Sequence, residues 1–176
     1  MRLTEKHVVR AAVQACRSFA KCSPNFFNFE ESANWRGWEN WLTVEIARRL
    51  DSRCVLAFFA YPKKKLRLDL FVKGNALAVE IKTNFITDRE AAKENRTLPD
   101  RVVKDAKKMR ALNAETGRLI LVATIFDTRE GLVAYKRTVN KDLAPTFVDY
   151  RVSWHDCSSG EGHLLLLALI KPATQK

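Results

Sequence analysis

The chain has 176 residues and 47% of them are hydrophobic, which predicts one domain with a substantial core over residues 1–176 and excludes wholesale disorder. The longest apolar run, residues 164–170, is too short to span a bilayer. The N-terminal residues carry no signal-peptide pattern, and the four cysteines form no CxxC pair. We therefore expect no membrane association, free thiols and a cytoplasmic location.

The charge balance favours a polyanionic partner. The 31 Lys and Arg residues outnumber the 20 Asp and Glu residues, which gives a formal net charge of +11. Nucleic acid is the simplest partner for such a chain. Many basic proteins nevertheless bind no nucleic acid specifically, so the charge alone does not decide the matter.

Two helices, a strand and a hairpin are predicted in the first half of the chain. Thr4 can cap a helix that runs to about Cys22, and a second helix is expected from about Arg36 to Leu50. Residues 54–61 are continuously apolar, which predicts a strand buried on both faces. Residues 66–83 then predict two strands joined by a turn at Gly74 and Asn75.

The second half of the chain alternates between helical and strand patterns. We expect a loop over residues 84–97, then a helix that starts near Pro99 and ends before Gly117. Strands are predicted over residues 118–126, 131–137, 148–154 and 163–171. Helices interleaved with strands indicate the α/β class, with one mixed β-sheet flanked by helices.

Three charged residues interrupt the apolar hairpin. Because side chains alternate along a strand, Glu80 and Lys82 share one face of their strand, and Asp69 shares a face with Phe71 on the other. Buried charges are costly unless they are paired or bind a metal. Two carboxylates beside one lysine therefore predict a site for a divalent cation and a water molecule.

The cation expected at this site is Mg²⁺ or Mn²⁺. Hard cations take oxygen ligands, often one or two carboxylates with water and substrate phosphate. Asp69 and Glu80 would supply the carboxylates, and the backbone carbonyl of Ile81 would add a third oxygen. Lys82 would orient the attacking water or neutralise charge on the phosphate. This set suffices for phosphodiester hydrolysis.

A fourth carboxylate is predicted on the second helix. On a helical wheel, Trp38, Trp41 and Leu42 form an apolar stripe, and Glu45 falls inside it. Glu39 lies nearer the edge of that stripe and is the alternative. A structural ion pair of Glu45 with Arg48, Arg49 or Lys82 is the competing interpretation.

A helix carrying Glu45, a strand carrying Asp69 and a strand carrying Glu80-Ile81-Lys82 together resemble the PD-(D/E)XK nuclease superfamily. The resemblance implies a restriction-endonuclease-like core (helix, three strands, helix, strand) over about residues 36–126, with an extra N-terminal helix and extra C-terminal strands. It also implies a metal-dependent nuclease, and a DNA endonuclease is the first hypothesis. Asp69 and Glu80 would bind the metal, Lys82 would serve the attacking water and Glu45 would support the metal site. Leu68 stands where the motif has proline.

Two groups of basic residues are candidate DNA contacts. Arg89, Lys93 and Arg96 belong to the predicted loop just past Lys82, which makes them the preferred contacts. Arg101, Lys104 and Lys108 are expected on the third helix, roughly opposite its apolar face of Val102, Ala106 and Met109. For this second group, an ordinary solvated helix face is the competing interpretation.

Two other functions stay open at this point. One is a catalytically silent module on the same fold that binds nucleic acid or takes part in assembly. The other is an RNA-cutting or toxin-type nuclease. A homodimer is compatible with the first hypothesis, because cutting both strands of a duplex requires two sites.

Overall fold

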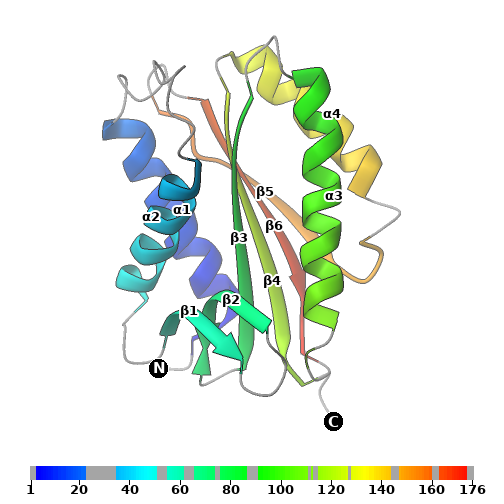
Figure 1. Ribbon diagram of the computed structural model, residues 1–176. Coiled ribbons are helices and arrows are strands. Elements are labelled where there is room, and N and C mark those ends of the chain that lie inside the picture. Colours follow the sequence, from blue (N-terminus) through cyan, green and yellow to red (C-terminus); the bar gives the residue numbers. More distant parts are fainter. Residues whose placement is uncertain are drawn as a thin grey trace.

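Figure 1 shows the computed structural model of the chain. It describes residues 3–22, 35–50, 55–61, 66–73, 76–86, 91–110, 112, 115–126, 128–143, 147–159 and 163–173. The helices and strands in chain order are α1 (Glu5–Cys22), α2 (Trp35–Arg49), β1 (Val55–Tyr61), β2 (Leu66–Val72), β3 (Leu77–Ile86), α3 (Ala91–Arg110), β4 (Gly117–Phe126), α4 (Arg129–Leu143), β5 (Arg151–Asp156) and β6 (His163–Lys171).

The strands form one six-stranded mixed sheet in the order β1-β2-β3-β4-β6-β5. Strands β3 and β4 run parallel, and every other neighbouring pair is antiparallel. Parallel neighbours require a long crossover connection, which α3 provides between β3 and β4. The predicted α/β class with a mixed sheet flanked by helices is therefore confirmed.

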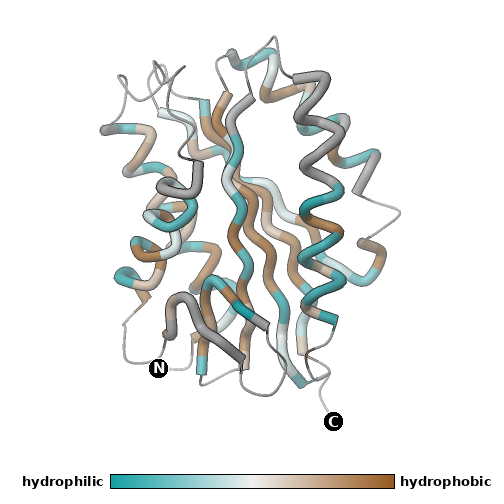
Figure 2. Tube along the Cα trace, in the orientation of Figure 1, coloured by the Kyte–Doolittle hydropathy of each residue, from teal (hydrophilic) through white to brown (hydrophobic). Residues whose placement is uncertain are grey.

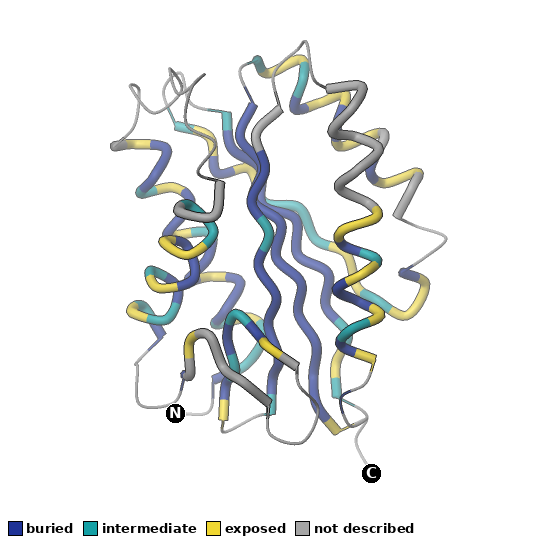
Figure 3. Tube along the Cα trace, viewed as in Figure 1, coloured by how far each residue is buried: buried dark blue, intermediate teal, exposed yellow. Residues whose placement is uncertain are grey.

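Helices cover both faces of the sheet, α1 and α2 on one side and α3 and α4 on the other (Figure 1). Strand β6 shows why both faces need a cover: Leu164 and Leu166 pack with α1 and α2, whereas Leu165 and Leu167 pack with α3 and α4. The central strands are accordingly apolar in Figure 2 and buried in Figure 3. None of the described helices is long and apolar enough to cross a membrane.

The N-terminal helices agree closely with their predicted bounds. The α1 helix begins directly after Thr4, whose carbonyl accepts the first helical hydrogen bonds from the backbone N–H groups of His7 and Val8. The α2 helix agrees with the prediction to within one residue at each end. The expectation for residues 54–61 is partly wrong, because β1 lies at the edge of the sheet and its Ala57 is exposed.

The strand predicted over residues 131–137 is wrong, because these residues belong to α4. The buried positions Leu132, Tyr135 and Val139 repeat with helical spacing, and Val133 between them is exposed. A strand would have placed Val133 and Tyr135 on the same face. The apolar residues in this segment were too few to separate the two periods by inspection.

The loop predicted over residues 84–97 is also wrong. Strand β3 continues to Ile86, and α3 begins at Ala91, well before Pro99. The segment from Ala91 to Arg96 is rich in strong helix formers, which outweigh the cost of a proline inside the helix. The predicted turn residues Gly74 and Asn75 lie outside the described residues.

The helical assignment of α4 makes a prediction about stability. We expect Leu132→Ala to lower the free energy of unfolding by about 2–5 kcal/mol, because it opens a cavity under α4. Val133→Ala should stay within about 0.5 kcal/mol, because the Val133 side chain is exposed. Urea denaturation of both variants measures the difference. Equal losses in the two variants would contradict the helix.

Candidate functional site

Asp69 and Glu80 lie side by side where the pairing between β2 and β3 ends. The described ladder runs from Val72 opposite Leu77 to Leu70 opposite Val79, and Asp69 and Glu80 are the next residues on their strands. Oδ2 of Asp69 accepts a hydrogen bond from the backbone N–H of Ile81 at 2.7 Å. A carboxylate thus replaces the strand-to-strand backbone contact, and the two acidic side chains meet beside it.

Lys82 lies at the centre of a cluster of charges. Its ammonium group is within 4 Å of four carboxylates that come from four different elements, and its side chain is mostly buried. Lys82 Nζ also donates a hydrogen bond to the backbone carbonyl of Ile81 at 2.9 Å. The members of this carboxylate cluster, with their distances from Lys82 Nζ, are Asp105 (3.4 Å), Glu39 (3.6 Å), Glu80 (3.8 Å) and Asp69 (3.9 Å).

Glu80 is the most deeply buried carboxylate of the cluster, with a side chain only 2% exposed. Its Oε1 accepts a hydrogen bond from Lys108 Nζ on α3 at 2.5 Å. Burial and the nearby charge of Asp69 raise the pKa of Glu80 to about 7, although the hydrogen bond from Lys108 opposes this shift. Glu80 is therefore a carboxylate that strongly favours a cation beside it.

Burial and the surrounding charges also shift the pKa values of Lys82 and Glu39. Burial lowers the pKa of Lys82, but the charges of the four carboxylates outweigh burial and hold that pKa above its usual value. Burial raises the pKa of Glu39, and the positive charge of Lys82 compensates in part. Lys82 is therefore a fixed positive charge near neutral pH.

The placement predicted for Glu45 is wrong, and Glu39 takes its position. The carboxylate of Glu45 pairs with Arg48 and Arg49 on the same helix, each at 2.8 Å. The hydrogen bond from Arg48 lowers the pKa of Glu45, as expected for a structural ion pair. This is the competing interpretation given above.

The error comes from the tryptophans of α2. Trp41 is 40% exposed and packs against Phe19 of α1, with ring centroids 5.4 Å apart, instead of facing the sheet. The buried stripe of α2 contains Leu42 and Ile46, and it continues to Leu50 just past the end of the helix. Glu39 stands three residues before Leu42 and seven before Ile46, so it belongs to that stripe. The spacing of the aliphatic residues alone would have identified it.

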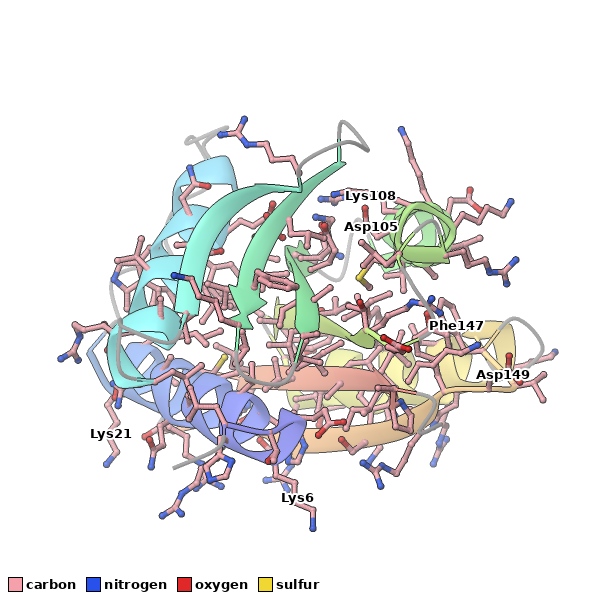
Figure 4. The ribbon with its side chains drawn as sticks, turned by 90° about the horizontal axis from the view of Figure 1, so that it is seen from below. Lys6, Lys21, Asp105, Lys108, Phe147 and Asp149 are labelled. Atoms are coloured by element: carbon pink, nitrogen blue, oxygen red, sulfur yellow. The ribbon has the colours of Figure 1, made fainter. Side chains whose placement is uncertain are left out.

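Asp105 is a member of the cluster that the sequence analysis missed. It lies three residues after Val102 and four before Met109, inside the buried stripe of α3. Figure 4 shows Asp105 and Lys108 together on α3, whereas Lys6 and Lys21 project from α1 on the far side of the sheet. A carboxylate within an apolar helix stripe is the signal that could have found Asp105.

The predicted DNA contacts have different outcomes. Arg89 and the side chains of Lys93 and Arg96 lie outside the described residues. Arg101 and Lys104 are exposed on α3. Lys108 is not on the solvated face that was expected, because its ammonium reaches Glu80.

The residues present fit a hard divalent cation. Among the described residues, the four carboxylates and the ammonium groups of Lys82 and Lys108 sum to a formal charge of −2 when all six are ionised, and the positive charge of Arg101 also lowers the pKa of Glu39. Oδ2 of Asp105 is buried and makes no hydrogen bond among the described residues, although Lys82 Nζ lies 3.4 Å from it. The described residues contain no ready-made group of three or more His, Cys, Asp or Glu ligands. Mg²⁺, which uses one or two carboxylates and keeps several waters, does not require such a group.

Known proteins add nothing to this assignment. Comparisons of the chain with protein-family models, with curated proteins and with solved structures find no match. The chemistry of the site follows from its own side chains: buried oxygen donors, a central ammonium group and an excess of negative charge.

The raised pKa of Glu80 makes stability depend on pH. A carboxyl group whose pKa is higher in the folded state stabilises the protein below its unfolded pKa of 4.5, and this contribution is lost as pH rises through about 7. Relative to wild type, Glu80→Gln should therefore gain up to roughly 3 kcal/mol of unfolding free energy between pH 4.5 and pH 7. Urea denaturation in EDTA across this range measures the gain. A constant difference between the two proteins would contradict the raised pKa.

Proposed function

We propose that this chain is a metal-dependent endonuclease of the PD-(D/E)XK type that hydrolyses phosphodiester bonds in DNA. The observation that carries the proposal is the meeting of Asp69, Glu80 and Lys82 at the end of the β2–β3 ladder. The element order from α2 to β4 supports it, since helix, three strands, helix, strand is the order of the restriction-endonuclease-like core.

Each residue of the carboxylate cluster has its own role in the proposed reaction. Asp69 and Glu80 would hold Mg²⁺ or Mn²⁺, which when bound acts as a Lewis acid and lowers the pKa of its water. The Ile81 carbonyl accepts a hydrogen bond from Lys82 and would add a third oxygen through its second lone pair. The ammonium group of Lys82 is held within 4 Å of both carboxylates. From there it orients the attacking water and offsets negative charge on the phosphate. Glu39 and Asp105 hold Lys82 in place from α2 and α3.

DNA is the substrate that the charge distribution favours. The chain carries an excess of eleven positive charges, and Arg101 and Lys104 are exposed on the helix that carries Asp105 and Lys108. A phosphate backbone bound along α3 would therefore pass the cluster. A homodimer would bring two such sites to the two strands of a duplex.

Cleavage assays test this proposal directly. With Mg²⁺ or Mn²⁺ we expect cleavage of plasmid DNA, and with EDTA none. Asp69→Ala and Glu80→Ala should abolish cleavage because each removes an oxygen ligand of the cation. Lys82→Ala should lose the chemical step by a factor of about 10² or more while DNA binding is kept. Gel electrophoresis separates nicked from linear product and so reports one-strand or two-strand cutting.

Two glutamates of α2 provide a matched pair of variants. Glu39→Gln should reduce cleavage, because Glu39 faces Lys82, whereas Glu45→Gln should leave it close to wild type. The reverse order would restore the original assignment of Glu45. Cleavage of RNA but not DNA would identify an RNA nuclease, and binding without any cleavage would identify a silent module.

DNA binding should depend on salt through the exposed cations of α3. We expect Arg101→Gln combined with Lys104→Gln to flatten the slope of log affinity against log salt by roughly 1.8, because each lost phosphate contact removes about 0.9. The same two changes at Arg137 and Lys141, exposed on α4, are the control and should leave the slope unchanged. Binding is measured in EDTA, so that no cleavage occurs. Equal effects of the two double variants would place the DNA path away from α3.

A further inference from the structure

We propose that the ammonium group of Lys108 occupies the position of a divalent cation on Glu80, and that the two exchange. When the cation binds Glu80, Lys108 is released from it and becomes available to a substrate phosphate. The inference rests on the cation site of the proposed function and names the residue that competes for it.

The contacts of Glu80 identify the competitor. Among the described residues, two lysines lie within 4 Å of its carboxylate, but they differ in distance and in the oxygen they approach. Lys108 Nζ donates to Oε1 at 2.5 Å, whereas Lys82 Nζ is 3.8 Å from Oε2. Lys108 therefore provides the close cationic partner that a buried carboxylate needs when no metal is bound.

The same oxygen cannot serve both cations. A divalent cation would approach a Glu80 oxygen to about 2.1 Å. An ammonium group on that carboxylate would then lie against a doubly charged ion in a buried site, where the repulsion is screened least. A cation that binds Oε1 therefore displaces the Lys108 ammonium group, whereas Lys82 lies 3.8 Å from the other oxygen, Oε2.

Lys108 is the lysine that is able to leave. Its side chain is 31% exposed and lies in the last turn of α3. Rotation about the bonds of its long side chain carries the ammonium group into solvent. Lys82, in contrast, is 14% exposed, has four carboxylates around it and donates to the Ile81 carbonyl. The exchangeable and the fixed positive charge of the cluster are thus two different lysines.

The exchange predicts that removing the lysine at position 108 strengthens Mg²⁺ binding. Lys108→Met removes the competitor while keeping the length of the side chain, so it should bind Mg²⁺ roughly tenfold more tightly than wild type, a change of about 1.4 kcal/mol. Lys107→Met on the same helix removes one charge from an exposed side chain and is the matched control. It should change the affinity far less. Isothermal titration calorimetry with MgCl₂, without nucleic acid and at pH 8.5 to limit competition from protons, measures the affinity.

Two further variants keep the test decisive. Lys108→Arg keeps the charge and can pair with Glu80 through two hydrogen bonds, so it should bind Mg²⁺ more weakly than wild type. This variant answers the question even if Lys108→Met does not fold. Glu80→Gln should abolish binding at this site. An affinity of Lys108→Met equal to or weaker than that of Lys107→Met, or an Arg variant that binds more tightly than wild type, would overturn the exchange.

The same proteins separate this inference from the proposed function. Tighter Mg²⁺ binding by Lys108→Met in a protein that cuts no nucleic acid would support the exchange and refute the nuclease. Mg²⁺-dependent cleavage by wild type, with no gain in affinity in Lys108→Met, would support the nuclease and refute the exchange. If both hold, Lys108→Met should bind Mg²⁺ more tightly yet cleave DNA more slowly at saturating Mg²⁺, because the released lysine is missing.

Discussion

Burial of the Glu80 carboxylate in the middle of a sheet is the constraint on which the other elements of the site depend. An ionised carboxylate in such a place is unstable without close cations, and here Lys108 and Lys82 provide them from α3 and β3. Lys82 then requires partners of its own, and these come from α2, from β2 and again from α3. The ion pairs around Glu80 thereby connect the two helical layers through the sheet.

The sequence predicts best those parts of the fold in which the pattern of hydrophobic residues is unambiguous. Strand β6 spans the predicted residues 163–171 because nine consecutive residues are almost entirely apolar, as a strand covered on both faces must be. The α4 helix was missed because the buried positions Leu132, Tyr135 and Val139, the ones found among its described side chains, give a weak helical signal. The early start of α3 was missed because Pro99 favours a first-turn position in general, and the helix formers before it prevailed here.

The residues of the site that lie close together in the sequence were predicted, whereas those that packing brings in from distant helices were not. Asp69, Glu80 and Lys82 belong to one hairpin, so strand alternation and a short turn sufficed to bring them together. Glu39 and Asp105 come from helices, and their approach to Lys82 depends on how α2 and α3 pack on the sheet. Each nevertheless stands inside the aliphatic stripe of its helix. An acidic residue within such a stripe is costly unless a cation meets it, which makes that pattern a useful indicator of a site.

The incomplete neutralisation of the cluster connects stability to the proposed function. If a third lysine balanced the four carboxylates further, the folded protein would gain little by binding a divalent cation. If Lys108 were absent, Glu80 would lose its close partner, and the folded state would be stabilised more strongly by the cation. A fixed lysine and an exchangeable one lie between these extremes. They allow the chain to fold without a metal while leaving a formal charge of −2 that a divalent cation can neutralise.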